Sequence, residues 1–495
     1  MTPRLSGRIA EVAAADPAAR ALEFRGRWHT WAELAAAMDR IDGVIDAHAG
    51  GGTAVVGVPA RNTPLHVALL LAVLRRGGCF VVINPARGRE SVRSDVAGLG
   101  LRLVLGQTAD IEELAGATDG TALVAFDDLD ADARVQHRPA RPAEGRSRPG
   151  VAVRMPTSGT TGPPKRIDLA YDALDASMAV AKHYEAKKRD PARRPSGVAL
   201  VNSPLAHMGG VFRVLQCVLD GRAFVFFERF DLRPWLEAVR TYRPKTVSLV
   251  PAALRMVLEA DPDPADLSSL RAVTSGTAPL APEDADAFTA RFGVPVLTSY
   301  AATEFAGGVA GWTLRDHEKH WSEKRGSAGR AQPGCALRVV DEHTHDVLGP
   351  DRPGLLEVRP AQLGRDAGWM RTNDLARIDA DGFLYILGRA DQAIIRGGFK
   401  VLPDRVRSVL EALPDVRGAV VLGVPDGRLG EVPAALVEPR PGAAPDPAAL
   451  RAEAARSLAG YEVPKEVHIV AELPRTTSGK VDLGAAKALL REVSA

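Results

Sequence analysis

A run of hydroxyl residues and glycines, "TSGTTG", precedes two prolines and Lys165. Glycines allow neighbouring backbone N–H groups to point toward one concave spot, and the hydroxyls add further donors. These donors suit the oxygens of a phosphate, although such a run taken alone is also typical of a flexible turn. The candidate phosphate loop comprises Thr157, Ser158, Gly159, Thr160, Thr161 and Gly162.

The spacing within this loop excludes the common P-loop of nucleoside triphosphatases. That motif needs four residues between two glycines and a lysine directly after the second one. Here Gly159 and Gly162 lie three positions apart, and two prolines separate Gly162 from Lys165. A different kind of phosphate site is therefore expected.

Alternating helix-like and strand-like segments would have to position this loop. Residues 67–76 have a helical pattern that ends at a glycine pair, and the apolar run "CFVVINP" follows with the length of a strand. Similar apolar runs begin at Gly197, Arg222, Lys245 and Arg271, and helix-like stretches lie between most of them. Parallel strands joined by crossover helices are the expected arrangement, an α/β fold.

Two changes in the sequence pattern indicate the domain organisation. From residue 326 short alternating strands such as "ALRVV" and "GLLEV" lie between turn residues, which predicts a β-rich subdomain over 326–388. Beyond it, helix-like "DRVRSVLEAL" and "DPAALRAEAARSL" lie among three strand-like runs, enough for a small α+β domain. We expect a large N-terminal domain over 1–388 and a C-terminal domain over 389–495.

The composition limits the class of protein. A chain of 495 residues, 46% hydrophobic and with a net charge of +2, predicts a multi-domain enzyme without a nucleic-acid or membrane partner. Its three cysteines, Cys79, Cys217 and Cys335, are too far apart for a disulfide framework or a cysteine zinc site, which favours the cytoplasm. The histidines of "HEKH" (317–320) and "HTH" (343–345) lack a zinc-site spacing, and both segments are expected to be exposed turns.

Seven segments, taken in order, resemble the adenylate-forming ligases, closest in layout to the acyl-CoA and aryl-CoA synthetases. The resemblance spans nearly the whole chain. The segments are "LLAVLRRGGCFVVINP", "TSGTTGPPK", "SPLAHMGG", "SGTAPL", "SYAATE", "RTNDLARIDADGFLYILGRADQAIIRGG" and "PRTTSGK". The family implies that a carboxylic acid is activated with ATP and magnesium and that the acyl group then passes to coenzyme A.

The resemblance assigns the ATP site. Lys165 and the loop 157–162 match the residues that hold the β- and γ-phosphates, Thr303 matches the α-phosphate hydroxyl, and Glu304 matches the magnesium ligand. Tyr300, with Ala301 beside it, matches the position that packs on adenine. The rest of that pocket comes from Ser275, Gly276, Thr277 and Ala278.

Further matches concern the ribose and the reaction itself. Asp374 and Arg389 match residues that bind the ribose hydroxyls. Lys480 matches the catalytic lysine that bridges the substrate carboxylate and the α-phosphate, and His207 matches a residue beside the acyl pocket. A lone histidine next to glycines is also commonly structural.

The same family implies motion between the two steps. Asp391 matches the hinge about which the C-terminal domain rotates. The rotation would bring the glycine loop "RGGFK", with Gly397 and Gly398, to the site in place of Lys480 for thioester formation.

The chain departs from the family pattern at several positions. Ala301 and Asn373 stand where the family usually has glycine, and Gln392 stands where a second aspartate is common. Ala301 should narrow the acyl tunnel. Asn373 tolerates positive φ almost as glycine does, so the turn is expected to survive.

The sequence therefore predicts a cytoplasmic, ATP- and magnesium-dependent ligase that joins a small carboxylic acid to coenzyme A. Two alternatives remain open. One is a stand-alone adenylation enzyme that passes the adenylate to a carrier protein or an amine, and the other is a non-catalytic nucleotide-binding homologue. The acid itself is not specified, although Ala301 favours an aromatic or short acid over a long acyl chain.

Overall fold

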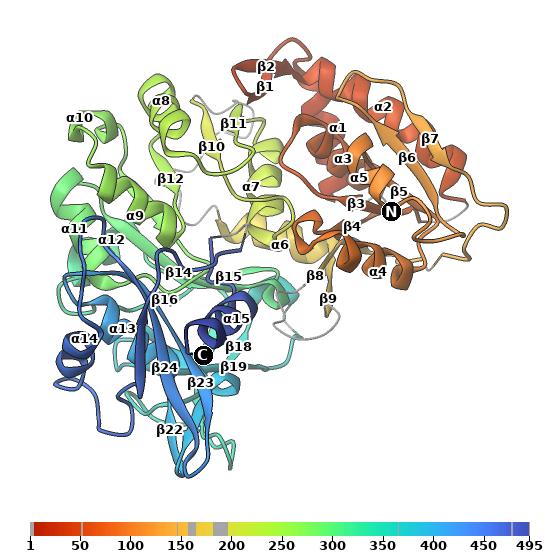
Figure 1. Cartoon of the computed structure of the whole chain (residues 1–495). Coiled ribbons are helices and arrows are strands. Elements are labelled where there is room, and N and C mark those ends of the chain that lie inside the picture. The colour runs from red at the N-terminus through yellow and green to blue at the C-terminus, as the bar shows by residue number, and fades with distance from the viewer. Residues whose placement is uncertain are drawn as a thin grey trace.

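The computed structural model describes residues 4–50, 53–145, 147–156, 165–181, 197–364, 366–476 and 479–494. Strands and helices alternate along most of the chain, as expected of an α/β protein. Figure 1 shows a large part that runs from red to green and a smaller C-terminal part, in blue at the lower left, that packs against it.

The first sheet has seven strands in the order β7-β6-β5-β3-β4-β8-β9. Its five inner strands pair in parallel and its two edge strands are antiparallel, which confirms the predicted crossover architecture. The inner strands are apolar along their length because both faces are covered. The strands are β3 (Val55–Pro59), β4 (Cys79–Ile83), β5 (Leu103–Gln107), β6 (Ala122–Phe126), β7 (Arg134–His137), β8 (Val151–Pro156) and β9 (Arg166–Ala170). The helices among them are α2 (Trp31–His48), α3 (Pro64–Arg75), η1 (Pro85–Arg87), α4 (Arg89–Leu99) and α5 (Thr108–Glu113).

The second sheet joins segments that are distant in the sequence. Its order is β10-β11-β1-β2, so the first strand of the chain pairs in parallel with β11. Such long-range pairing leaves no local sequence signal. The strands are β1 (Arg20–Phe24), β2 (Arg27–Thr30), β10 (Ala199–Val201) and β11 (Phe224–Phe226), and nearby helices are α1 (Arg4–Ala15), α6 (Tyr171–Ala181) and α7 (Met208–Leu219).

The third sheet, β12-β13-β14-β15-β16, is parallel over its first three strands and antiparallel after that. Its strands are β12 (Thr246–Ser248), β13 (Ala272–Ser275), β14 (Val296–Ala302), β15 (Gly307–Gly311) and β16 (Arg330–Ala331). Its helices are α8 (Leu232–Tyr242), α9 (Pro251–Ala260), α10 (Pro264–Leu267), α11 (Pro282–Phe292), η3 (Thr303–Phe305) and α12 (Leu314–His320). The expectation that "HEKH" is an exposed turn is wrong, because His317 is buried on α12 and its ring stacks on Trp321 with centroids 4.8 Å apart.

The fourth sheet is antiparallel, in the order β17-β18-β19-β20. It confirms the β-rich texture predicted from residue 326. The strands are β17 (Ala336–Val340), β18 (Gly354–Arg359), β19 (Met370–Ile378) and β20 (Leu384–Arg389), with short helices η4 (Ala361–Leu363) and η5 (Ala390–Gln392).

The C-terminal part has its own sheet, in the order β22-β21-β24-β23, and β25 pairs in parallel with β24. The predicted strand-like and helix-like segments of this part all appear. The strands are β21 (Ile394–Arg396), β22 (Phe399–Val401), β23 (Val416–Asp426), β24 (Gly430–Pro439) and β25 (Glu466–Ile469), and the helices are α13 (Pro403–Glu411), α14 (Pro447–Ala454) and α15 (Leu483–Val493).

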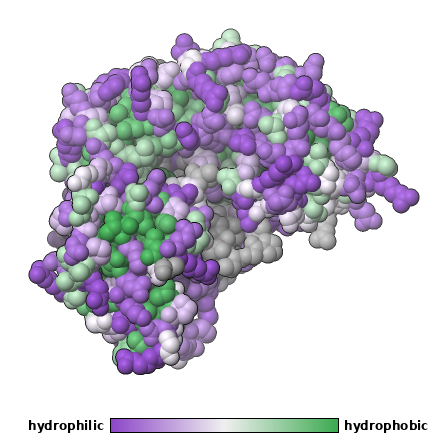
Figure 2. All heavy atoms as spheres, viewed as in Figure 1, coloured by the Kyte–Doolittle hydropathy of each residue, from purple (hydrophilic) through white to green (hydrophobic). Residues whose placement is uncertain are grey.

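Separate apolar clusters stabilise the parts of the molecule. The largest lies around α3, and two further clusters lie on the two sides of the C-terminal sheet. Figure 2 shows that hydrophilic residues cover most of the visible face and that a green apolar area lies on the lower-left lobe. Among the described helices, none combines the length and apolar character that crossing a bilayer requires.

Candidate active site

Lys480 lies on a short turn between the C-terminal sheet and α15. The Thr476 N–H donates to the Lys480 carbonyl (2.7 Å), and the Gly479 N–H donates to the Thr476 carbonyl (2.9 Å). The turn is followed by Asp482, whose carboxylate accepts from the N–H groups of Gly484 and Ala485 and so caps α15. The turn is therefore held by the start of a helix.

The same turn packs against the large part of the molecule. Gly479 has φ +77°, a conformation that favours glycine, and a Cβ at this position would lie 3.3 Å from Val250 and 3.7 Å from Ala252. These two residues lie at the N-terminal end of α9. The close approach places the next residue, Lys480, inside the interface between the two parts.

The Lys480 side chain lies among groups from three distant segments. Burial and the neighbouring Arg389 guanidinium lower the pKa of Lys480, while the Glu304 carboxylate partly opposes the shift. The positive charge of Lys480 in turn acts on His207. Tertiary packing thus brings together four residues that the sequence placed in separate motifs.

His207 is the N-cap of α7 and lies with its ring mostly inside the protein. Burial, with the added effect of Lys480, lowers the pKa of His207 to about 4. Its buried Nε2 has no hydrogen-bond partner among the described residues. The histidine is therefore neutral near pH 7, with one ring nitrogen available to a bound molecule.

Tyr300 and Asp374 are joined directly. The phenol of Tyr300, on β14, donates to Oδ2 of Asp374, on β19. Burial raises the pKa of both groups, and the hydrogen bond from the tyrosine partly offsets the shift for Asp374. The second carboxylate oxygen and the tyrosine ring remain for other contacts.

Arg389 and Asn373 both bind Asp391. The Arg389 guanidinium donates two parallel bonds to the carboxylate of Asp391 (2.9 and 2.8 Å), and Asn373 Nδ2 donates to Oδ2 (3.1 Å). Asn373 lies in β19 and is not among the residues with positive φ, so the expected left-handed turn is wrong. The side chain of Asn373, which stands where the family usually has glycine, therefore binds the predicted hinge residue Asp391.

The predicted adenine pocket lies at the end of β13. Ser275 is buried and its Oγ has no hydrogen-bond partner among the described residues. Gly276 lies against Ser299, since a Cβ there would be 3.1 Å from the Ser299 Oγ, and Thr277 has φ +71°. Ala278 completes the turn and is half-buried. The turn thus faces the strand that carries Tyr300.

The residues after Tyr300 lead to the predicted magnesium ligand. Ala301 is exposed, and Thr303 and Glu304 begin the short helix η3. Ala306 ends that helix with φ +57°. Glu304 lies near enough to Lys480 for its negative charge to raise the pKa of the lysine.

The structure does not place all the predicted residues in this cluster. Residues 157–162 lie outside the described residues, and Lys165 is exposed just before β9. Gly397 and Gly398 form the exposed turn between β21 and β22, where the Gly397 N–H donates to the Leu429 carbonyl (2.8 Å). In this arrangement the glycine loop is turned away while Lys480 is turned in.

The α9 helix is a contact that the sequence analysis missed. Arg255 Nη2 binds Glu411 of the C-terminal part (3.2 Å), and Glu259 accepts two bonds from Arg417 (2.7 and 2.8 Å). Ala252, Arg255 and Glu259 share one face of the helix through their spacing. The only sequence signal for this contact was the presence of charged residues at helical spacing on α9 and of oppositely charged residues in the C-terminal part.

A buried carboxylate links this contact to the lysine turn. Glu438, on β24, is fully buried and accepts from Arg417 (2.7 Å) and Arg475 (3.0 Å). Arg475 pairs with Val481 across the turn that carries Lys480. The ion pairs of α9 therefore continue to the base of the lysine turn.

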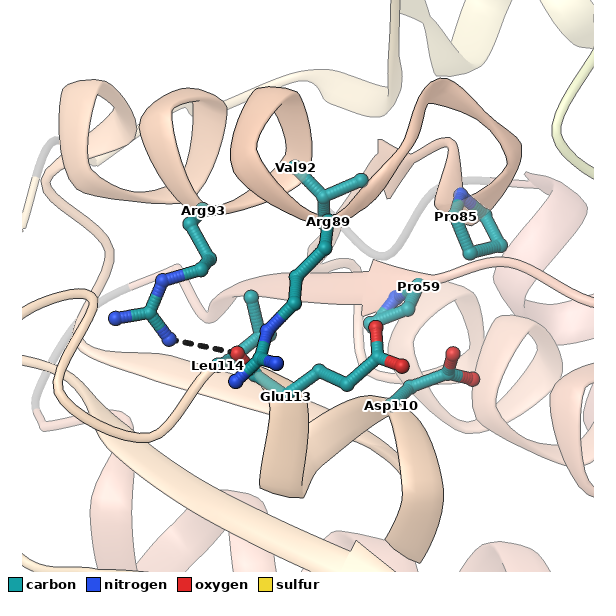
Figure 3. A pocket seen from close by; sticks show the side chains of 8 residues that line it. All are labelled: Pro59, Pro85, Arg89, Val92, Arg93, Asp110, Glu113 and Leu114. Atoms are coloured by element: carbon teal, nitrogen blue, oxygen red, sulfur yellow. Dashed lines mark hydrogen bonds between the residues drawn. The ribbon is translucent and has the colours of Figure 1, made fainter.

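A small pocket elsewhere was also considered as a site. Figure 3 shows it between α4 and α5, where Arg93 donates to the Glu113 carbonyl (2.7 Å). Its volume of about 10 Å³ holds at most one water. It is lined by Pro59, Pro85, Arg89, Val92, Arg93, Asp110, Glu113 and Leu114. It is too small for a nucleotide or an organic acid.

An α/β protein that presents a buried lysine, a neutral histidine and paired acidic and tyrosine groups at the junction of its two parts has the layout of an adenylate-forming enzyme. The model of the AMP-binding enzyme family matches residues 9–365, and that of the AMP-binding enzyme C-terminal domain matches residues 406–480. The chain belongs to the AMP-binding enzyme family. Members of this family that are CoA ligases use ATP and coenzyme A.

Three known proteins illustrate the similarity. The indoleacetate–CoA ligase of Aromatoleum aromaticum is 31% identical over 96% of this chain and 96% of its own. The amide bond synthetase McbA of Marinactinospora thermotolerans is 28% identical, with a TM-score of 0.79 over 98% of this chain and 99% of its own. ATP-bound MatB of Rhodopseudomonas palustris is 26% identical, with a TM-score of 0.83 over 100% of this chain and 99% of its own.

Two forms of MatB match the chain to different degrees. The TM-score with apo MatB is 0.72, lower than with the ATP-bound form. The chain as a whole therefore superposes better on the ATP-bound form.

Proposed function

We propose that this enzyme activates a carboxylic acid with ATP and transfers the acyl group to coenzyme A. In the first step a carboxylate oxygen attacks the α-phosphorus, the bond to pyrophosphate breaks, and an acyl-adenylate forms. In the second step the thiol sulfur of coenzyme A attacks the acyl carbon, the thiol proton is lost, and AMP leaves. The placement of Lys480 beside His207, Arg389 and Glu304 is the observation that carries this proposal.

Lys480 would stabilise the transition state of the first step. Its ammonium would contact both the substrate carboxylate and the α-phosphate. Burial leaves the charge poorly screened, which strengthens its attraction to developing negative charge. His207 is neutral, so its free ring nitrogen orients the acid without adding charge.

The nucleotide would bind through groups that the fold brings to the same region. Asp374 has one carboxylate oxygen left for a ribose hydroxyl, and Tyr300 is fixed by its bond to Asp374 so that its ring can stack on adenine. Residues 157–162 and Lys165 would bind the outer phosphates. Glu304 supplies a single hard oxygen ligand, which fits magnesium because that ion takes much of its coordination from phosphates and water.

The second step would follow rotation of a C-terminal domain, residues 389–495, about Asp391. The turn that carries Gly397 and Gly398 is flanked by Ile395 and Phe399, whose side chains are 51% and 57% exposed. Such apolar exposure is costly unless another state covers it. We propose that this face meets the site when Lys480 leaves it.

Pyrophosphate release tests the proposal directly. The assay combines the enzyme with ATP, magnesium and a panel of aromatic, short, medium and amino acids, each with and without coenzyme A. Acid-dependent release with thioester formation supports the full reaction. If no acid causes pyrophosphate release in a preparation that binds ATP, the result would favour a non-catalytic nucleotide-binding protein.

A different acceptor is the second candidate function. The similarity to an amide bond synthetase favours an amine, and a carrier-protein thiol is the other option. Pyrophosphate release that is unchanged by coenzyme A but produces an amide when an amine is added would support this candidate. The three cysteines are free, which is consistent with a cytoplasmic reaction.

The rate of the first step should begin to fall at a lower alkaline pH than it would if Lys480 had the pKa of an ordinary lysine. The pKa of Lys480 is lowered, and the active form is the ammonium, so activity falls as pH rises through that lowered pKa. Measured rates of pyrophosphate release should decline there, whereas thioester formation from added adenylate should not. The residual activity of Lys480→Arg should not decline at alkaline pH. The same alkaline decline in this variant would contradict the assignment of the decline to Lys480.

Reversing one charge on α9 should slow the first step selectively. Glu259→Arg replaces the bond to Arg417 with repulsion and weakens the docked arrangement, by about 1 to 2 kcal/mol or roughly tenfold. Single-turnover rates of the two steps measure the effect. Glu228→Arg is the matched control, since Glu228 binds Arg25 within the large part; equal effects of the two variants would refute a docking role.

A further inference from the structure

Arg213, on α7, is half-buried, and its guanidinium contacts the third sheet. Its Nη2 donates to Thr274 Oγ1 (3.1 Å) and its Nη1 to Gln216 Oε1 (3.2 Å), both neutral oxygens. Among the described residues no carboxylate forms an ion pair with it, and burial lowers its pKa. A desolvated charge without a counter-charge is costly, so its retention calls for an explanation.

Two other arginines with little exposure are paired with carboxylates. Arg166, whose side chain is 5% exposed, binds Asp95 (2.5 Å). Arg255, 13% exposed, binds both Asp284 (2.6 Å) and Glu411 (3.2 Å). Arg213 differs from these two arginines because both of its side-chain partners are neutral oxygens. Arg213 keeps unused N–H donors and its full charge.

The position of Arg213 relates it to the candidate active site. It lies six residues after His207 on the same helix, which corresponds to about 9 Å along the helix axis. One turn earlier on the same face is Gly209, where an added Cβ would meet nothing within 4 Å. The space beside Gly209, one turn before Arg213 on this face of α7, is therefore open.

The sheet opposite Arg213 is open in the same region. Thr274 pairs with Leu297, so the alternation of side chains places Ser299 and Ala301 on the sheet face that Arg213 contacts. Leu297 is buried, whereas Ser299 and Ala301 are exposed. The exposed strip of this sheet face therefore begins at the end of β14 that is next to Glu304, and it ends where Arg213 contacts Thr274.

We propose that Arg213 binds a second carboxylate of the substrate acid, at the closed end of the acyl pocket. This proposal rests on the proposed function and names its substrate class: a short or aromatic dicarboxylic acid. The planar fork of a guanidinium fits a carboxylate with two parallel bonds. One carboxyl reacts beside His207 and Lys480 while the other meets the Arg213 guanidinium. The two backbone positions are about 9 Å apart along the helix axis, and the length of the arginine side chain lets the acid span less than that distance.

Pairs of acids with one skeleton test this proposal. Terephthalate is compared with benzoate and 4-hydroxybenzoate, and 4-carboxycinnamate with cinnamate, by pyrophosphate release. The wild type should prefer each diacid, and Arg213→Gln should lower kcat/KM for the diacids by on the order of 10- to 100-fold, mainly through KM. The monoacids should change little. Arg213→Lys should recover only part of the loss, and Arg233→Gln, at an exposed arginine of α8, should change nothing.

A binding measurement separates this proposal from the proposed function. Thermal unfolding is recorded with each acid, without ATP. Stabilisation by a diacid that disappears in Arg213→Gln supports the carboxylate site even if no acid is turned over, which would count against the ligase reaction only. Turnover of monoacids with no preference for diacids and no effect of Arg213→Gln would overturn the inference and leave the ligase reaction intact.

Discussion

Lys480→Ala is expected to lower acid-dependent pyrophosphate release by about 100- to 1000-fold, the range found when one charge-stabilising donor is removed from an active site. The lysine is the cation proposed to contact the carboxylate and the α-phosphate, and its turn is fixed by the bonds of Thr476 and Gly479 and by the cap of α15. Alanine removes the charge without disturbing those backbone contacts. Presteady-state release of pyrophosphate measures the loss.

Two controls make this result specific. ATP affinity should be nearly unchanged, because Asp374, Tyr300 and the outer-phosphate residues remain. Thioester formation from added acyl-adenylate should also persist, since Lys480 belongs to the first step alone. Full pyrophosphate release by Lys480→Ala would remove the proposed role of this residue.

Asp391→Pro is expected to leave adenylate formation within about tenfold of the wild type while slowing thioester formation by about 100-fold or more. Proline fixes φ near −65° and restricts the preceding residue, so the torsional change needed for rotation is blocked. The short helix η5 already has helical torsions at this position. The enzyme should therefore accumulate bound adenylate, which quenched-flow analysis with coenzyme A detects.

The ion pair at this position requires a separate control. Proline also removes the bonds from Arg389 and Asn373, which itself alters the docked arrangement. Asp391→Ala removes those bonds but keeps a free backbone, so it should form thioester at a rate much closer to the wild type. If both variants lose the second step equally, the effect comes from the ion pair and the hinge assignment is wrong.

Most elements of the fold could be predicted from local patterns. The apolar runs at β4, β10, β11, β12 and β13, and the helices between them, follow from spacing alone. The pairing of β1 with β11 could not be predicted, because partners so distant in the sequence leave no local pattern. His317 shows a similar limit, since its burial depends on Trp321 and Trp312 around it.

The candidate site shows the same division. The residue types and their motifs, with Lys480, Asp374, Tyr300 and Glu304 among them, could be recognised because each motif is contiguous. The contacts that these residues make with one another could not be predicted from the sequence. Asn373 was expected to replace glycine in a turn, but it lies in a strand and binds Asp391, because the neighbouring segment η5 presents a carboxylate there.

The sequence by itself determined the family, the two-part organisation and the chemical groups available, because these depend on side-chain identity, local spacing and apolar periodicity. Only the tertiary structure decided which of those groups meet. It placed Lys480 beside His207, joined α9 to the C-terminal part through Arg417, and left Arg213 without a carboxylate among the described residues. Packing and desolvation act between segments that are far apart in the chain, so their outcome depends on the whole fold.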